Sequence, residues 1–372
     1  MKIAVFHELP RGGARRAVNS YAVELKKKHT VDLYFVDEKD SKSEHQFYSS
    51  VFFYKFMPRR WEGGNWRVRV YKDSVELINV YKLNKKIAAD IDAKKYDVVF
   101  VSASKFIEAP FIMRFLKTPF LFFSEDPYYR IIYDPLLRIS KDLDIFRYNY
   151  ERCNRIVRKI LDRKNVECAK ICLAPSKYIA ELFSKTYNKH VDVVYHGVDT
   201  NFFTRSKIKK NIDLFYIGSY EPFDGYKLLN DSLSHLKKSI TVRKILIEEE
   251  WISDDKVLRD LYRRSKIMFC PAQREGLGLV LLEALSCGTT VIALDEAGHK
   301  EIIKQGKNGY LVPPNPTKIA KLLESLLSNA KEIRKLSEYG RDDIEKNWTW
   351  KKRTEELEKF LLMQAGYTHV KR

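Results

Sequence analysis

The sequence predicts an α/β protein made of two Rossmann-like, doubly wound units. Short runs of β-branched and aromatic residues alternate with amphipathic helical stretches through the first half of the chain, which favours a mainly parallel sheet with right-handed crossovers. A basic stretch at 200–211 interrupts this pattern, and the same alternation then restarts. The length of 372 residues is enough for two domains with full cores.

Hydrophobic periodicity places the individual elements. In the first half, strands are expected at 3–6, 31–36, 98–101, 120–123, 171–174 and 191–195, and helices at 14–28, 75–91, 143–163 and 177–187. In the second half, strands are expected at 214–217, 244–247, 267–270, 291–294 and 310–312, and helices at 257–264, 280–286, 317–329 and 331–347. The irregular segment 40–75 is either an inserted loop or an extra hairpin. The expected domains are 1–205 and 206–347, followed by a helical segment at 348–372.

The chain carries a formal net charge of +19, which indicates an anionic partner. Nucleic acid, an anionic membrane surface and a phosphorylated substrate would each fit. No sequence signature of a nucleic-acid-binding fold accompanies the charge, so nucleic acid is the least favoured of the three. Cations and aromatics mix at Arg59, Arg60, Trp61, Trp66 and Arg67, as they would on an edge that faces a membrane.

The five cysteines are scattered, which is typical of reduced thiols in the cytosol. Cys168 and Cys172 have the spacing of one pair of metal ligands, but no second pair with zinc spacing accompanies them. No apolar run approaches the roughly 18 residues that span a bilayer, and the N-terminal run 1–6 is too short for a secretory signal. The expected location is the cytoplasm, including the inner face of the membrane.

The most informative stretch is 274–288, where an acid in a glycine-punctuated turn, Glu275, precedes an apolar helix that carries a second acid, Glu283. A buried strand at 267–270 leads into this turn. Phosphate oxygens bind to the exposed N–H groups of a helix N-terminus, and carboxylates accept hydrogen bonds from paired hydroxyls. The order of strand, acid, helix N-terminus and second acid therefore suits a ligand that has both phosphates and sugar hydroxyls.

A glycine pair, Gly12 and Gly13, follows the first strand and precedes a helix with Arg15 in its first turn. Glycines there let the backbone approach a phosphate, and the helix supplies N–H groups. Ligands of such sheets bind beyond the carboxyl ends of the strands. The glycine pair, the residues after 120–123, Gly218 and Glu275 are therefore expected around one cavity.

The run from Pro271 to Gly288 resembles the donor-binding signature of family 4 retaining glycosyltransferases, which are two-domain GT-B enzymes. The resemblance continues through Glu301 to Pro314, and further matches in the same order run along most of the chain. They include the glycine loop at 12–16, the segments 174–178 and 194–202, and Trp350, which resembles an aromatic in a helix that crosses back to the first domain.

The resemblance implies residue roles. The acid that matches Glu275 binds the donor sugar, the acid that matches Glu283 binds the ribose hydroxyls, and the N–H groups that follow Gly276 face the sugar or the diphosphate. Glu125 stands where the family often has a histidine near the reacting carbon. The candidates are, for catalysis, Glu275 and Glu125 and, for donor binding, Glu283, Gly12, Gly13, Arg15, Gly218, Ser219, Arg274, Gly276, Leu277, Gly278 and Leu279. No metal and no cofactor are expected.

The sequence departs from the family pattern after the strand 214–217. Ser219 and Asp224 occupy the places of an Arg and a Lys that hold the diphosphate, and Arg15, Arg274 and Lys227 are the candidate substitutes. The second domain is also short between 225 and 266, so a strand–helix unit is expected to be missing or shortened there.

The resulting hypothesis is a metal-independent, retaining hexosyltransferase. It would move a sugar from a nucleotide-diphosphate sugar, bound by the second domain, to a hydroxyl of a glycan or lipid-linked acceptor bound by the first. Three alternatives stay open: a non-catalytic homologue that acts as a scaffold, favoured by Ser219 and Asp224; an epimerase of nucleotide sugars; and a basic nucleic-acid-binding protein, favoured by charge alone.

Overall fold

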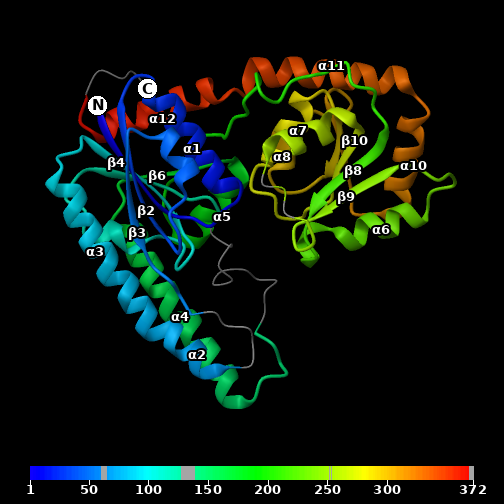
Figure 1. Cartoon of the computed structure of the whole chain (residues 1–372). Coiled ribbons are helices and arrows are strands. Elements are labelled where there is room, and N and C mark those ends of the chain that lie inside the picture. Colours follow the sequence, from blue (N-terminus) through cyan, green and yellow to red (C-terminus); the bar gives the residue numbers. More distant parts are fainter. Residues whose placement is uncertain (60–64, 127–138, 251, 253, 368–372) are drawn as a thin grey trace. The chain divides into compact units, whose positions relative to one another are not determined.

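The computed structural model describes residues 1–59, 65–126, 139–250, 252 and 254–367. The chain forms two α/β units (Figure 1). The first contains Met1–Pro175, Ile179–Val194 and Thr354–Arg372, and the second contains Ser176–Tyr178 and Tyr195–Arg353. The expected domain boundary at residue 205 falls inside the second unit.

The first unit is built on a parallel sheet of seven strands in the order β3-β2-β1-β4-β5-β6-β7. The direction of winding reverses between the central strands β1 and β4, which is the place where ligands bind in doubly wound sheets. The strands are β1 Lys2–Glu8, β2 Thr30–Asp37, β3 Ser50–Lys55, β4 Val98–Ser104, β5 Phe120–Phe123, β6 Ile171–Ala174 and β7 Asp192–Val193.

Two long helical segments of the first unit, α2–α3 and α4, run side by side (Figure 1). Arg69 of α2 pairs with Glu151 of α4, so the two segments are tied by charge. The helices are α1 Gly13–Lys26, α2 Trp66–Tyr71, α3 Leu77–Ala93, α4 Ile145–Glu167 and α5 Lys177–Tyr187, with a π-helical turn η2 Lys72–Glu76 between α2 and α3 and 3₁₀ turns η1 Lys42–Phe47 and η3 Phe111–Arg114.

The second unit has a parallel sheet of five strands in the order β12-β11-β10-β8-β9. In the described residues, this sheet ends at β9, which occupies the place that β2 has in the first sheet. Among these residues, a strand equivalent to β3 is therefore missing beside β9. The strands are β8 Ile212–Gly218, β9 Val242–Leu246, β10 Ser265–Cys270, β11 Thr290–Leu294 and β12 Gly309–Val312. The helices are η4 Pro222–Asp224, α6 Tyr226–Ser234, α7 Asp255–Arg264, α8 Leu279–Ser286, α9 His299–Ile302, α10 Pro316–Leu327, α11 Ala330–Asn347 and α12 Trp350–Gln364.

Both faces of the second sheet are buried, as expected for parallel strands between helices. Phe215 and Met268 belong to the core that includes residues of α7 and α8. Their neighbours Leu214 and Ile267 belong to the opposite core, with residues of α6 and α10. Successive side chains of a strand point to opposite faces, so the apolar run in each strand supplies both cores.

The last helix, α12, begins in the second unit and continues in the first from Thr354 onward. Within the first unit, its Glu358 contacts Lys28 Nζ at 3.0 Å and His29 Nε2 at 2.8 Å. These charges anchor the end of the chain to the helix–strand turn after α1.

Two elements differ from the sequence-based expectation. The irregular segment 40–75 contains β3, a parallel edge strand beside β2 and not half of a hairpin. The segment after Gly225 contains α6, a nine-residue helix. In the described residues no helix is long and apolar enough to cross a membrane, and all five cysteines are free.

Candidate functional site

The two predicted acids lie at the carboxyl end of β10. Glu275 is half-buried in the loop 271–278, and Glu283 lies inside α8 with only 3% of its surface exposed. Gly278 precedes the helix with φ 102° and ψ 69°, a left-handed conformation that favours glycine. The first helical residues, Leu279 and Val280, therefore start a helix whose N–H groups have no preceding carbonyl to bond.

Backbone hydrogen bonds join this loop to its neighbours. The Gln273 N–H donates to Phe223 O, in the loop after β8, at 2.8 Å. The Gly298 N–H, in the loop after β11, donates to Glu275 O at 3.0 Å. The structure thus brings three loops together at one edge of the second sheet, around Glu275.

Glycines permit this close approach. Gly225 has φ 74°, and a Cβ there would lie 2.8 Å from the carbonyl carbon of Pro271. A Cβ on Gly298 would lie 2.8 Å from the carbonyl carbon of Gly276. Gly276 O in turn accepts a hydrogen bond from Ser176 Oγ at 2.5 Å. Leu277 points into the core, with 3% of its surface exposed, so only its backbone is available to a ligand.

Glu283 has a partner that sequence reasoning missed. The hydroxyl of Tyr262, on α7, donates to Glu283 Oε2 at 3.0 Å. Tyr262 is fully buried, and its ring packs edge-on against Phe215 at 5.6 Å between centroids. The hydroxyl therefore holds the carboxylate from the core side. The sequence offered no sign of this contact, because the two residues are 21 positions apart on different helices.

The loop after Gly218 is bonded within itself. The hydroxyl of Ser219 donates to the Asp224 carboxylate and also accepts the Glu221 N–H at 3.2 Å. The Tyr220 N–H donates to Glu248 at 3.1 Å. Ser219 was predicted to bind the donor, but its hydroxyl is used inside the loop.

The three candidate cations differ in placement. Arg274 lies in the loop of Glu275, with its guanidinium 5.1 Å from the ring centroid of Phe223. Lys227 forms an ion pair with Asp231 at 2.6 Å along the surface of α6. These two belong to the second unit, and Arg274 is the one that shares a loop with Glu275.

Arg15 is a predicted donor-binding residue, and its side chain already has acidic partners inside the first unit. It is 2% exposed and lies in the first unit, paired with Asp37 at 2.7 Å and with Glu44 at 2.7 Å. Burial lowers the pKa of Arg15, but the hydrogen bonds that its guanidinium donates to these carboxylates outweigh burial and raise the pKa overall. Its charge is therefore neutralised inside the protein by Asp37, the last residue of β2, and by Glu44 of η1.

Gly12, Gly13 and Glu125 also belong to the first unit. Gly12 has φ 153° and ψ −168°, a conformation restricted to glycine, and a Cβ there would have no atom within 4 Å. The backbone before α1 is thus open to a ligand. Glu125 is half-buried and follows Ser124 at the carboxyl end of β5.

A buried histidine lies beneath the loop after β11. His299 Nε2 is 3.4 Å from Cys270 Sγ, and Nδ1 is 3.1 Å from Leu294 O. Burial lowers the pKa of His299 to about 4, although the contact with Leu294 O opposes the shift. Burial also raises the pKa of the Cys270 thiol. Both groups are therefore neutral at pH 7. Neither adds a charge beneath the loops around Glu275.

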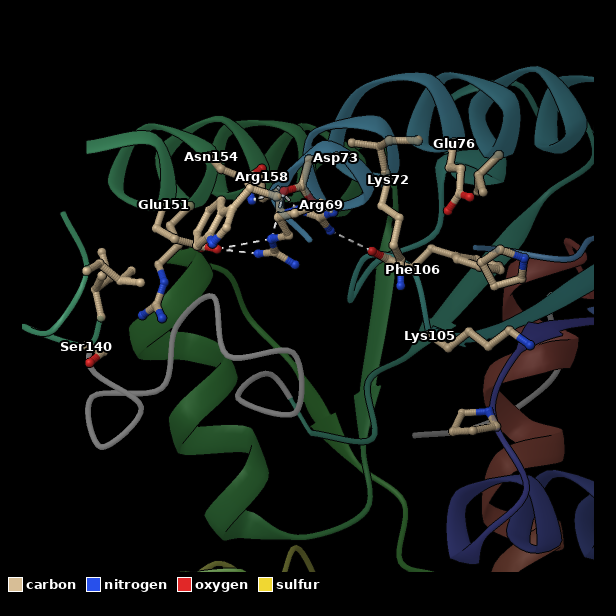
Figure 2. A pocket seen from close by; sticks show the side chains of 18 of the residues that line it. Arg69, Lys72, Asp73, Glu76, Lys105, Phe106, Ser140, Glu151, Asn154 and Arg158 are labelled. Carbon is tan, nitrogen blue, oxygen red and sulfur yellow. Dashed lines mark hydrogen bonds and ion pairs between the residues drawn. The ribbon is translucent and has the colours of Figure 1, made fainter. Parts of the chain in front are cut away.

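The first unit contains a cavity of about 670 Å³ (Figure 2). Pro10, Glu38 and Lys105, which line it, follow β1, β2 and β4, so the cavity lies at the carboxyl edge of the sheet where the winding reverses. Its volume is in the range of small-molecule sites. The other walls come from α2, η2, α3, α4 and the residues just before α4.

Charged side chains tie the walls of this cavity together. Asp73, with a side chain only 4% exposed, binds Arg158 at 2.7 Å, Arg69 at 3.0 Å and Asn154 at 2.9 Å. Arg69 also binds Glu151 through two hydrogen bonds, which Figure 2 shows as dashed lines. Lys72 projects from η2 toward Phe106. Sequence spacing can suggest a pair four residues apart, such as Arg69 with Asp73. It gives no sign of contacts between residues about 80 positions apart, such as Arg69 with Glu151.

Two residues of the predicted membrane-facing edge, Arg59 and Trp66, contact other side chains of the first unit. Arg59 lies over the Tyr71 ring at 4.1 Å, and Trp66 packs edge-on against Tyr150 at 6.0 Å between centroids and lines the cavity. Arg67 is exposed. Arg60 and Trp61 lie outside the described residues.

Comparison with known proteins identifies the family. The model described as Glycosyltransferase Family 4 matches residues 11–202, which is more than half of the chain. The chain belongs to glycosyltransferase family 4. A second model, Glycosyl transferases group 1, matches residues 250–343, which include Glu275 and Glu283.

Curated relatives match over part of their length. Spore coat protein SA of Bacillus subtilis is 29% identical over 150 residues, 40% of this chain and 39% of that protein. Glycosyltransferase MJ1178 of Methanocaldococcus jannaschii is 27% identical over 201 residues, 49% of this chain and 56% of that protein. The chain thus matches less than two thirds of each of these relatives.

The fold resembles that of solved glycosyltransferases over nearly the whole chain. The Anabaena protein Alr3699/HepE, solved in complex with UDP and glucose, superposes with a TM-score of 0.68 at 15% identity, covering 97% of this chain and 99% of that one. The predicted GT-B class, with two Rossmann-like units, is therefore confirmed.

Proposed function

We propose that the chain is a retaining glycosyltransferase that binds a nucleotide-diphosphate sugar on its second unit. The observation that supports this most is the convergence of three loops and the start of α8 around Glu275, with Glu283 in the same helix. A carboxylate beside a helix N-terminus matches a ligand that carries hydroxyls next to phosphates. The relative Alr3699/HepE, which shares this fold, was crystallised with UDP and glucose.

In this proposal Glu275 orients the donor sugar, Glu283 accepts the ribose hydroxyls, and the N–H groups of Leu279 and Val280 face the diphosphate. Arg274 is the cation we assign to the diphosphate, because it lies in the same loop as Glu275. Ser219 and Asp224 bond to each other where the family pattern has two cations. We therefore expect a weaker hold on the diphosphate, since each charge-assisted hydrogen bond contributes roughly 1.5–3 kcal/mol.

We assign the hydroxyl acceptor, a glycan or a lipid-linked sugar, to the cavity of the first unit. Its walls offer cations such as Lys72, the carboxylate of Glu76 and the aromatic surfaces of Trp66 and Phe106, which are the groups that bind a polyhydroxylated molecule. Glu125 and the Gly12–Gly13 backbone belong to the same unit and stay candidates for contact with the reacting groups. In the described residues no group of three or more metal-ligating side chains gathers; metal-independent transfer is part of the proposal and rests on the family resemblance.

The proposal is tested by calorimetric titration with a panel of nucleotide sugars, followed by a transfer assay with the donor that binds. Glu275→Ala should keep nucleotide binding and lower kcat/KM roughly 100-fold, because the carboxylate contacts the sugar. Glu283→Ala should instead weaken nucleotide binding itself. Glu338→Ala, an exposed acid on α11, serves as the control. Transfer that is unchanged in Glu275→Ala would contradict the assignment of the site.

The same measurements separate the alternatives. A scaffold binds no nucleotide sugar, and an epimerase converts the donor without an acceptor. A nucleic-acid binder shows oligonucleotide affinity that falls steeply with salt and does not respond to Glu283→Ala. Retention is read from the anomeric configuration of the product by NMR, and metal independence from transfer in the presence of a chelator.

A further inference from the structure

Helix α4 is reversed in polarity relative to an ordinary surface helix. Its inner side carries Glu151, Arg158, Asp162 and Asn165, and hydrogen bonds satisfy these polar groups. Asp162 accepts the Ala109 N–H at 2.7 Å, and the Asn165 amide donates to Ala109 O at 2.7 Å. A helix on the surface of a globular protein normally places its apolar stripe toward the core. In α4 most of the inward-facing side chains are polar, and hydrogen bonds join them to the rest of the first unit.

Most of the large aliphatic residues of α4 point to solvent; Leu161 and Val166 face inward. Five apolar residues of the helix are among the most exposed large hydrophobic side chains of the described structure: Ile145 66%, Phe146 83%, Ile156 50%, Val157 52% and Ile160 50%. At 100° per residue, these five positions fall within an arc of about 120°. They form two apolar groups, 145–146 and 156–160, on the same outer side of the helix, which is an arrangement that marks an interaction site and not scattered surface hydrophobes.

Cations accompany this outer face. The exposed charged residues between 145 and 164 are Arg147, Arg152, Arg163 and Lys164, and the two acids of that stretch, Glu151 and Asp162, are buried. Exposed acids occur only at the two ends of the helix, where Asp144 pairs with Arg147 at 3.1 Å and Glu167 is the last residue. Apolar side chains next to an excess of basic residues are the composition of a helix that lies in the interface of an anionic bilayer. The neighbouring segment adds exposed Val75 and Ile78, at 41% and 53%.

We propose that the outer face of α4, from Ile145 to Lys164, docks the first unit on an anionic membrane surface. A second copy of the chain would be a poorer occupant, because a two-fold contact would place the same cations against each other. An anionic bilayer matches both the apolar and the basic side chains. The inner side of the same helix lines the cavity through Glu151 and Arg158, so docking would bring the cavity to the membrane and favour an acceptor carried by a lipid. Docking itself does not depend on the proposed transfer reaction.

The test is flotation of the full chain with phosphatidylcholine vesicles that either contain or lack phosphatidylglycerol. The wild type should bind the anionic vesicles, bind the neutral ones far less, and dissociate as salt rises. Val157→Glu should lower the partition coefficient tenfold or more, because it removes an apolar contact and adds repulsion. Val257→Glu is the matched control, since Val257 is 49% exposed on α7 of the second unit. Arg152→Gln and Lys164→Gln should each lower partitioning about five-fold.

A wild type that fails to bind anionic vesicles would overturn the proposal, as would equal binding by the V157E and V257E variants. So would a concentration-dependent dimer in sedimentation velocity that Val157→Glu abolishes without any vesicle binding, because the face would then be an interface between copies. Glu275→Ala should bind vesicles like the wild type. A failed transfer assay and a failed flotation assay therefore report on different parts of the protein.

Discussion

The carboxyl edges of the two sheets carry candidate sites that are held together in different ways. In the second unit, backbone hydrogen bonds and glycines join the loops after β8, β10 and β11, and Glu275 lies among them. In the first unit, ion pairs between α2, η2 and α4 hold the walls of the cavity. Loops that are joined by backbone hydrogen bonds should tolerate the loss of a surface charge but not an added Cβ at their glycines. A cavity whose walls are joined by ion pairs should instead be sensitive to the loss of a charged side chain.

The largest effect on stability is expected from Asp73→Ala in the first unit. The substitution leaves Arg69 and Arg158 without their shared carboxylate in a partly buried site, and breaking a buried pair costs about 3 kcal/mol. The free energy of unfolding from urea titration measures this loss. Asp231→Ala, which breaks only the exposed pair with Lys227, should cost no more than about 0.5 kcal/mol. Equal losses in the two variants would contradict the view that charges hold the cavity.

The second unit should respond most to Gly225→Ala. Alanine at φ 74° is strained, and its Cβ would press on the backbone of Pro271, so we expect a loss of about 2–3 kcal/mol. Gly306 provides a matched control because it has φ 67° but no atom within 4 Å of the built Cβ. Gly306→Ala therefore carries only the backbone strain, about 1 kcal/mol. If the two variants melt at the same temperature, the contact between the β8 and β10 loops does not limit stability.

The same contrast explains what the sequence predicts well. The strands 120–123 and 171–174 and the helix 177–187 have the expected bounds, because short apolar runs end at polar or turn-forming residues. The Glu275 loop can also be predicted from the sequence, since its glycines and its acids are close together in the chain. Helix α6 was not predicted, because it is nine residues long and its N-cap, Gly225, has no side chain to accept a capping hydrogen bond.

The cavity of the first unit could not be predicted from the sequence. The cavity depends on contacts between residues about 80 positions apart, such as Arg69 with Glu151, and no local pattern announces them. The acidic partners of Arg15 were missed for the same reason. A cation in the first turn of a helix after a glycine pair is a sound candidate for a phosphate ligand, but Asp37 and Glu44 neutralise it from distant segments. The sequence shows where charged residues occur along the chain, but it does not show which oppositely charged residues they contact in the fold.

Acid should weaken both units through one buried histidine in each. Burial lowers the pKa of His299 to about 4, while burial and then the charge of Arg15 lower the pKa of His7 well below its usual value. Because the unfolded chain takes up a proton at about pH 6.5 and the folded chain resists it, stability is complete above that pH and falls as the pH drops toward 4. By pH ~4.5, His299 alone should account for about 2 kcal/mol.

Unfolding free energies measured from pH 7 to 4.5 test this dependence. His299→Gln should flatten the curve, and so should His7→Gln, whereas the exposed His235→Gln should leave its slope unchanged. A slope that stays the same in both buried-histidine variants would show that carboxylates, and not these histidines, set the acid limit.

The smallest effect tests whether Tyr262 acts on the donor site or only on the core. Tyr262→Phe removes the hydroxyl that holds Glu283 and keeps the ring, so the Kd for the nucleotide sugar should rise about five-fold, corresponding to roughly 1 kcal/mol for one hydrogen bond. Tyr48→Phe is the matched control, because the buried Tyr48 hydroxyl donates to Asn19 at 2.7 Å within the first unit, whereas Glu275 and Glu283 belong to the second. Both variants should lose similar stability, but only Tyr262→Phe should lose donor affinity. If calorimetry finds equal affinities, Glu283 is positioned by α8 alone and the hydroxyl of Tyr262 serves packing.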